Sequence, residues 1–364
     1  MGKKMENDNG ININIILDRL VRTTFRDAVR ASVKDPAMMT FFLRTLKAQK
    51  KAADRRQTCE EEGLHVPPVI ILSVTDRCNL HCHGCYSQGL NREAKAEMSS
   101  DRLERLFSEA EALGTAIILL AGGEPLMKPG LLDITKKYPR IIFPLLTNGT
   151  LLDDQIVGRI KEQRNVIPML SLEGFEGDTD LRRGAGTYAR VCKAMEKLQA
   201  TGVFFGVSIT VTRSNFATVT ADSFVRGLLG RGCKAFFYVD YSPVSKETES
   251  WVPTAEQRAV LSGSSFRERY PATFLSFPGE EKAFGGCLSS GRGFVHVSAS
   301  GDLEPCPFAP YSDASLQKMS LREALGSQFL RRIRDNSGEL LEADGGCAIW
   351  KKREWAQSLL TGNR

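Results

Sequence analysis

A chain of 364 residues with 42% hydrophobic and 25% charged residues is long enough for one large domain and smaller appendages. Its net charge of +6 offers no broad basic face for nucleic acid. No apolar run approaches the roughly 18 to 20 residues of a transmembrane helix, so the sequence predicts no stable membrane insertion.

The amino terminus, Met1 to Glu6, lacks the apolar core of a secretory signal. Nine cysteines without an export signal indicate a reducing compartment and metal ligation rather than disulfide bonds. We therefore expect a cytoplasmic protein.

Residues 1–65 are predicted to form a helical extension. Apolar residues recur at helical spacing from Leu17 to Ala28, Pro36 interrupts the pattern, and a second helical stretch begins at Phe41. The charged stretch from 49 to 62 is typical of a solvated helix that ends at Gly63. We expect this extension to pack on the main domain. A lid over a substrate, or a contact with an acidic partner or membrane surface, is the alternative.

From residue 66 to 245, short apolar runs alternate with amphipathic ones. The predicted strands are Val69–Val74, Ala116–Ala121, Ile141–Leu146, Val166–Leu172, Val203–Val211 and Ala235–Tyr241. Between the first two, a helix is predicted with Ser99 or Ser100 as its cap and Gly114 as its stop. Repeated strand, helix, strand units predict an α/β fold, a partial (β/α)6 barrel of the TIM type with a parallel sheet.

The most informative segment follows the first predicted strand. Residues 76–85, here called the cysteine loop, carry Cys78, Cys82 and Cys85 in a CxxxCxxC pattern. Three thiolates can hold three irons of a cubane iron–sulfur cluster and leave the fourth iron open to a small molecule. An open iron implies chemistry rather than electron transfer alone.

Further motifs stand at the ends of the next three predicted strands. These motifs are Gly122-Gly123-Glu124-Pro125, Thr147-Asn148-Gly149 and Ser171-Leu172-Glu173-Gly174. The loops after the strands of a parallel barrel gather on one face, which carries the active site. We therefore expect the cysteine loop and all three motifs to converge.

In this order and at these intervals, the cysteine loop and the three motifs resemble the radical S-adenosylmethionine (SAM) superfamily. The resemblance implies a [4Fe-4S] cluster on Cys78, Cys82 and Cys85, whose open iron binds SAM through the amino nitrogen and carboxylate oxygen. One position departs from the family pattern. The residue before the third cysteine is usually aromatic, whereas here it is Gly84, with Tyr86 just after the cysteine. Which side chain shields the cluster and packs near adenine stays open.

The resemblance also assigns roles to other residues. Those expected to contact the cofactor are Tyr86, Gly122, Gly123, Glu124, Pro125, Asn148, Ser171, Glu173, Arg183 and Ser208. The two glycines would let the backbone approach the methionine part of SAM, and Glu124 or neighbouring carbonyls would accept from its ammonium group. Asn148, Ser171 and Glu173 would bond the carboxylate or ribose, and Arg183 would lie near the carboxylate. Tight turns and solvated loop side chains are the structural alternatives.

A structural zinc ion is the competing interpretation of the cysteine loop, because His81 and His83 lie among the cysteines. Such a site would normally take its fourth ligand from a second close pair, and it would not need the Gly-Gly-Glu-Pro motif. We expect both histidines to be loop residues, solvated or packed.

Residues 246–278 are predicted to be a linker, and residues 279–364 a small α+β domain. Cys287 and Cys306 flank a predicted hairpin, whose turn at Gly301 would bring Cys306 back beside Cys287. Two cysteines can bind at one metal site only if the chain turns back in this way.

A helix is predicted around Leu321 to Ile333, followed by Gly345-Gly346-Cys347. Together with the hairpin, these elements resemble the auxiliary-cluster domains of radical SAM enzymes, called SPASM when full and twitch when short. The resemblance implies at most one second iron–sulfur cluster, held by Cys287, Cys306 and Cys347. Its fourth position would be filled by another group or left for substrate. A domain without metal and a zinc site are the alternatives.

The function implied by the resemblance is enzymatic. A flavodoxin or ferredoxin would reduce the cluster, and SAM would be split into methionine and a 5'-deoxyadenosyl radical, which takes a hydrogen atom from a peptide or small-molecule substrate. A second cluster would favour an oxidative outcome. A haem-pathway enzyme, acting by oxidative decarboxylation or side-chain removal, is the alternative within this class. The alternatives outside this class of enzyme are an iron–sulfur electron carrier and a zinc-stabilised binding module.

Overall fold

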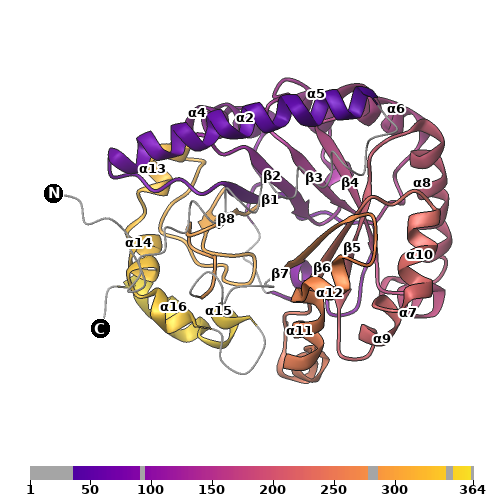
Figure 1. The fold of residues 1–364 in the computed structure, drawn as a ribbon. Coiled ribbons are helices and arrows are strands. Elements are labelled where there is room, and N and C mark those ends of the chain that lie inside the picture. Colours follow the sequence, from indigo (N-terminus) through magenta and orange to yellow (C-terminus); the bar gives the residue numbers. More distant parts are fainter. Residues whose placement is uncertain (1–35, 91–94, 278–285, 342–346, 362–364) are drawn as a thin grey trace.

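The computed structural model describes residues 36–90, 95–277, 286–341 and 347–361 (Figure 1). Within these ranges nine strands form one sheet in the order β7-β6-β5-β4-β3-β2-β1-β8-β9. Every neighbouring pair is parallel except β8 with β9. The predicted α/β barrel-like fold is confirmed. The first predicted helix, Leu17 to Ala28, lies outside the described residues.

The strands are β1 Val69–Thr75, β2 Ile117–Gly122, β3 Phe143–Thr147, β4 Val166–Leu172, β5 Gly206–Val211, β6 Ala235–Asp240, β7 Thr273–Phe277, β8 Phe294–Val297 and β9 Leu303–Glu304. The six predicted strands are all present with small shifts at their ends. β7 lies within residues 246–278, which we predicted to be a linker. It pairs with β6 along its whole length and so extends the barrel sheet.

The helices of the barrel half are α2 Pro36–Glu61, α3 Tyr86–Gly89, α4 Ser100–Leu113, α5 Leu131–Lys136, α6 Asp154–Gln163, α7 Glu176–Arg183, α8 Thr187–Thr201, α9 Phe216–Val219 and α10 Asp222–Gly230. Those that follow are α11 Ala255–Ser262, α12 Ser264–Arg267, α13 Leu321–Leu325, α14 Gln328–Asp335, α15 Ala348–Lys351 and α16 Arg353–Thr361. The 3-10 turns are η1 Pro125–Met127, η2 Lys246–Trp251 and η4 Ser337–Leu340. α4 begins as predicted, because the Ser99 side chain accepts from the Arg102 N–H, and Gly114 ends it with φ 93°.

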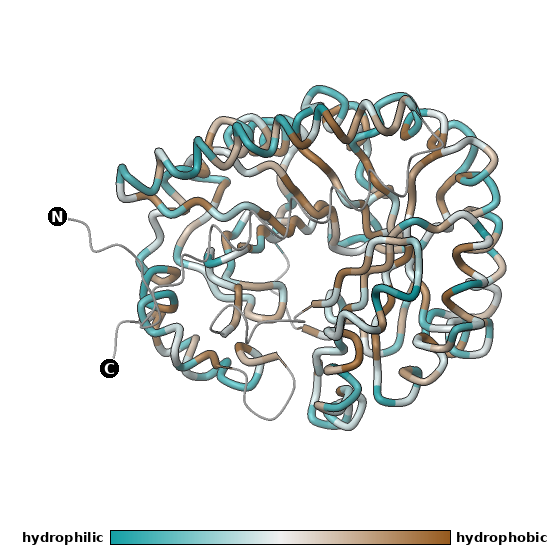
Figure 2. Tube along the Cα trace, in the orientation of Figure 1, coloured by the Kyte–Doolittle hydropathy of each residue, from teal (hydrophilic) through white to brown (hydrophobic). Residues whose placement is uncertain are grey.

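Strand β1 shows how the barrel separates its two faces. Ile70, Leu72 and Val74 belong to the main buried core, which also includes the apolar faces of the surrounding helices. Because side chains alternate along a strand, Ser73 points to the opposite face, the barrel lumen. Figure 2 shows the strands as predominantly hydrophobic and the long helix α2 as largely hydrophilic.

Helix α2 crosses the amino-terminal ends of the strands (Figure 1). Met38 and Phe42 form a buried cluster there, and the Phe42 ring lies 5.1 Å from the Phe204 ring, just before β5. Gln49 donates to the carbonyl of Ala116, just before β2. Although we predicted this charged part to be solvated, it carries a buried stripe along one side. α2 therefore lies at the end of the barrel opposite to the loops that follow the strands, and it is not a lid over them.

The carboxy-terminal section adds a hairpin to the other sheet edge. β8 pairs parallel with β1, and β9 returns antiparallel to β8, which confirms the predicted hairpin. The single helix predicted around Leu321 to Ile333 is two helices, because Gly326 follows α13 and Ser327 caps α14 by accepting from the Leu330 N–H. No helix of the described ranges has the length and apolar character needed to span a bilayer.

Candidate active site

Hydrogen bonds to Glu97 hold the start of the cysteine loop at the end of β1. The Thr75 hydroxyl donates to Glu97 Oε1 at 2.6 Å, and the Asp76 N–H donates to the same oxygen at 3.0 Å. Lys128, beyond the second motif, contacts the other Glu97 oxygen at 3.1 Å. The loop is therefore anchored to neighbouring segments before its first cysteine.

Two glycines bring the second motif against this loop. The Gly123 N–H donates to Thr75 O and the Glu124 N–H donates to Arg77 O, each at 2.8 Å. A Cβ atom on Gly122 would lie 2.4 Å from Thr75 O, and one on Gly123 would lie 2.1 Å from Arg77 O. The close approach that requires glycine is thus to the backbone around the cysteine loop. Contact with the methionine part of SAM stays a prediction.

Glu124 joins the second motif to the third. Its carboxylate is 1% exposed and accepts from the Thr147 hydroxyl and the Asn148 N–H, both at 2.8 Å. The Leu126 N–H donates to it at 3.1 Å, where Pro125 opens the turn η1. Burial raises the pKa of Glu124, and these three donors oppose that shift. The expected contact with an ammonium group stays a prediction.

Asn148 joins the third motif to the cysteine loop. Its side-chain amide donates to Asn79 Oδ1 at 2.8 Å, and Asn79 in turn donates to the Thr150 hydroxyl at 2.8 Å. Asn148 Oδ1 also accepts from Thr150. The loops after β1, β2 and β3 therefore form one hydrogen-bonded frame.

Glu173, after β4, joins the fourth motif to the same frame. Its Oε1 accepts from Arg182 and Arg183, both within 2.6 Å, and its Oε2 is buried with no partner among the described residues. Arg182 also donates to the carbonyl of His83, and the His83 N–H donates back to Arg182 O at 2.8 Å. No contact between Arg182 and His83 was predicted from the sequence, since hydrogen bonds between distant loops have no local signal.

The lumen-facing serines lie on adjacent strands. Ser171 of β4 is directly opposite Ser208 of β5 in the register. Ser208 is buried and Ser171 is partly exposed. Tyr86 lies differently: its ring packs at 5.3 Å against Phe308 of the carboxy-terminal section. Its predicted contact with SAM stays a prediction.

The thiols of the cysteine loop are close enough to influence each other's ionisation. Burial raises the pKa of Cys78, and charges of Glu124, Cys82 and Cys85 raise it further. Burial also raises the pKa of Cys82, while Arg183 opposes the shift. No three His, Cys, Asp or Glu side chains in the described ranges converge to hold a single metal ion. In a cubane each cysteine binds a different iron, so its ligands need not converge in that way.

The cysteines predicted to hold a second cluster also lie together. Cys306 is fully buried, and burial, a hydrogen bond with Cys347 and the charge of Cys287 raise its pKa. The hairpin brings Cys306 back to Cys287, and the segment before α15 adds Cys347. Cys287 and Cys306 are buried and Cys347 is partly exposed. Three such thiols fit an iron–sulfur cluster, in which each cysteine binds a different iron.

A buried chain of polar side chains in the lumen was not predicted from the sequence. His296 of β8 is 0% exposed; its Nε2 lies 2.9 Å from Ser73 Oγ and its Nδ1 lies 2.7 Å from Glu304 Oε2. The histidine interrupts the apolar run of β8, and this interruption was the feature of the sequence from which its role could have been predicted. Its partners depend on the pairing of β8 with β1, which no local pattern predicts.

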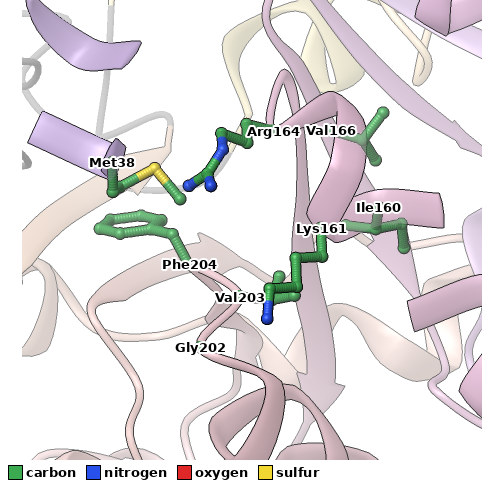
Figure 3. A pocket seen from close by; sticks show the side chains of 8 residues that line it. All are labelled: Met38, Ile160, Lys161, Arg164, Val166, Gly202, Val203 and Phe204. Atoms are coloured by element: carbon green, nitrogen blue, oxygen red, sulfur yellow. The ribbon is translucent and has the colours of Figure 1, made fainter. Parts of the chain in front are cut away.

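The small pocket in Figure 3 lies away from these groups. Met38, Val166 and Phe204 line it at the amino-terminal ends of the strands, beside α2. The cysteine loop and the motifs lie at the carboxyl ends, so this pocket takes no part in the candidate site.

Comparison with known proteins decides between the interpretations of the cysteine loop. Residues 72–216 match the family model described as the radical SAM superfamily. This match identifies residues 72–216 as a radical SAM segment of the chain. Enzymes of this superfamily use a [4Fe-4S] cluster and SAM. The three loop thiols fit such a cluster, and Glu173 Oε2, a buried acceptor with no partner among the described residues, belongs to a carboxylate whose charge acts on Cys82.

Two curated proteins are similar to this chain over most of its length. The AdoMet-dependent heme synthase of Methanosarcina barkeri is 25% identical over 78% of this chain and 88% of its own length. The mycofactocin maturase MftC of Mycobacterium tuberculosis is 28% identical over 68% of this chain and 66% of its own length. Both relatives extend beyond the segment that the family model matches.

A solved structure shares the fold over most of the chain. SuiB of Streptococcus suis bound to SAM superposes with a TM-score of 0.65 at 16% identity, over 82% of this chain and 77% of SuiB. SuiB bound to its precursor peptide SuiA gives a TM-score of 0.62 at 16% identity, over 84% of this chain and 77% of SuiB. At this identity the likeness shows the fold.

Proposed function

We propose that the protein cleaves SAM reductively at a [4Fe-4S] cluster on Cys78, Cys82 and Cys85 and takes a hydrogen atom from a peptide or small-molecule substrate. The observation that carries this proposal is the hydrogen-bonded frame that joins the loops after β1 to β4. When bound, the cluster supplies the electron that divides SAM into methionine and a 5'-deoxyadenosyl radical.

The residues of the frame position the cofactor. Glu173 Oε2 is the buried acceptor available to ribose hydroxyls, while Arg182 and Arg183 hold its other oxygen in place. Arg183 also places a positive charge beside Cys82, where an anionic carboxylate would bind. Ser171 and Ser208 present hydroxyls on adjacent strands of the lumen wall.

The lumen provides the second requirement of the chemistry. Hydrogen transfer needs the substrate carbon close to the radical and water kept away. Helix α2 closes the far end of the lumen with Met38 and Phe42, so substrate would enter from the face that carries the motifs. The Ser73, His296 and Glu304 chain adds polar groups in the lumen that can orient a polar part of the substrate.

A second cluster on Cys287, Cys306 and Cys347 would favour an oxidative outcome, because it could accept the electron left on the substrate radical. The mutual proximity of these thiols supports the proposal. A variant with alanine at Cys78, Cys82 and Cys85 is expected to retain about three or four irons per chain after anaerobic purification. Complete loss of iron would remove the second cluster from the proposal.

The main test measures 5'-deoxyadenosine in anaerobic protein reduced with dithionite in the presence of SAM. We expect the product from the wild type and from Cys192→Ala, a cysteine on α8 outside both thiol groups. Cys82→Ala should give none. Absence of 5'-deoxyadenosine from wild-type protein that holds its iron would refute the proposed function.

A second candidate is a haem-pathway reaction, such as oxidative removal of a tetrapyrrole side chain. It is favoured by the relative from M. barkeri, because that match spans 88% of the heme synthase. Titration with an iron tetrapyrrole, followed by its visible absorbance, tests it. A saturable spectral shift would support a haem-pathway substrate, and no shift with otherwise active protein would favour a peptide or another small molecule.

A further inference from the structure

The strands of the barrel keep part of one face exposed. In β1 the side chain of Ile71 is partly exposed, whereas its neighbours Ile70 and Leu72 are 0% exposed. The same alternation recurs in β2, β3 and β6. Because the buried set packs on the surrounding helices, the partly exposed set faces the lumen. These lumen residues are Ile71, Leu119, Pro144, Leu146, Phe237 and Val239, and all of them are apolar.

Ionisable side chains are scarce on this wall. All nine strands lie within the described residues, and at their lumen-facing positions the ionisable side chains are His296 of β8 and Glu304 of β9. Their Nδ1 and Oε2 atoms lie 2.7 Å apart. With the carboxylate ionised, the pair is neutral when the imidazole is protonated and negative when it is not. The strands therefore give the lumen no net positive charge.

The arginines at the motif end of the lumen are already paired. Arg182 and Arg183 both contact Glu173 Oε1 at 2.6 Å. Arg183 also lies beside Cys82, where the proposed function places the SAM carboxylate. Neither arginine is thus left to neutralise a second carboxylate deeper in the barrel.

Burial decides which groups such a lumen accepts. An apolar group that enters it leaves water and gains contacts with the apolar wall, and both effects stabilise the complex. A carboxylate would lose its hydration without gaining a cation, and it would approach the Glu304 carboxylate. The wall therefore favours an uncharged apolar group over an anion of the same shape.

We propose that the substrate group that enters the lumen and reacts there is an uncharged aliphatic or aromatic group. Its carbon–hydrogen bond breaks homolytically, the hydrogen atom passes to the 5'-deoxyadenosyl radical, and the unpaired electron stays on the substrate carbon. The inference rests on the proposed function and deepens it by naming the class of group that reacts. It disfavours a carboxylate-bearing side chain of a tetrapyrrole as that group.

The test offers the reduced protein two probes with SAM. They are the N-acetyl amides of leucine and of aspartate with deuterated side chains, which have nearly equal shapes and differ in charge. Deuterium in 5'-deoxyadenosine, measured by mass spectrometry, shows that the side chain of the probe reached the radical. At equal concentrations we expect at least about tenfold more deuterated product from the leucine probe. Equal labelling, more labelling from the aspartate probe, or no deuterium from either would overturn the inference.

Leu119→Lys should reverse part of this preference. It places an ammonium group on the lumen wall, so labelling from the aspartate probe should rise and labelling from the leucine probe should fall. Leu43→Lys is the matched control, because Leu43 is 54% exposed on α2, and its ratio should be that of the wild type. An unchanged ratio in Leu119→Lys protein that holds its iron would also overturn the inference. If that variant holds no iron, the wild-type ratio decides alone.

Binding without turnover gives an independent measurement. Saturation-transfer NMR of the unreduced wild-type protein should detect contact with the methyl groups of undeuterated leucine probe, and Leu119→Lys should weaken this signal while Leu43→Lys leaves it unchanged. Failure of the proposed function has a different result. Wild-type protein that holds its iron and forms no 5'-deoxyadenosine from SAM would refute the proposed function, whereas normal formation without a preference between the probes would refute only the inference.

Discussion

Replacing Gly123 by alanine should separate the second motif from the cysteine loop. The new methyl group would lie 2.1 Å from Arg77 O and 2.5 Å from the carbonyl carbon. Both are backbone atoms that no side-chain rotation can move away, so the two segments would have to part by about 1 Å. This movement strains the bonds from Gly123 N to Thr75 O and from Glu124 N to Arg77 O.

The magnitude follows from these contacts. Overpacking costs about 1–3 kcal/mol, and each weakened backbone hydrogen bond adds up to about 1 kcal/mol. We expect Gly123→Ala to lower the free energy of unfolding by about 1–5 kcal/mol. The same shift moves the loop that carries Cys78 and Cys82, so the iron content per chain should also fall.

The assay is anaerobic urea unfolding together with iron determination. Gly158→Ala is the matched control, because Gly158 lies within α6 and a Cβ there meets nothing within 4 Å. That change should stabilise the protein by about 0.5–1 kcal/mol through helix propensity. A Gly123→Ala protein with wild-type iron content and an unfolding free energy within about 0.5 kcal/mol of the wild type would refute the reasoning.

Two further predictions concern the ends of the barrel. Phe42→Ala should lower the free energy of unfolding in urea by about 3–5 kcal/mol, because Phe42 is 1% exposed and packs against Phe204. Leu43 is 54% exposed, so Leu43→Ala should lower it by less than about 0.5 kcal/mol. Equal losses would contradict the closure of the barrel by α2. Although burial raises the pKa of Glu97, hydrogen bonds from Thr75, Asp76 and Lys128 lower it below its usual range. The stabilisation from ionised Glu97 is therefore present above the usual glutamate pKa and is lost as the pH falls through the lowered one. The difference in unfolding free energy between the wild type and Glu97→Gln should be constant above about pH 5 and shrink below it, and growth of that difference on acidification would contradict the assignment.

Local patterns determined the elements of the barrel and the place of its motifs. Ser99 and Gly114 predicted both ends of α4, because a cap and a left-handed stop act within a few residues. The run from 166 to 172 predicted β4 with its observed ends. Parallel strands gather their following loops on one face, so the convergence of the motifs also followed from the order of elements.

Other predictions failed where contacts between distant segments decide the structure. The charged end of α2 reads as solvated, yet Gln49 and Arg56 are buried against the segments before β2. Residues 246–278 read as a linker, yet β7 joins the sheet through its pairing with β6. Burial depends on which surface lies opposite, and no periodicity within a segment contains that information.

The sequence alone therefore determined the cysteine spacing, the alternation of strands and helices and the superfamily to which these point, since each is a property of neighbouring residues. Only the tertiary structure decided that β8 lies beside β1, which places His296 against Ser73 in the lumen. It likewise decided that Tyr241 and Trp251 fill the space beside Gly84. These contacts join residues far apart in the chain, and they form only when close packing of the whole barrel brings complementary side chains together.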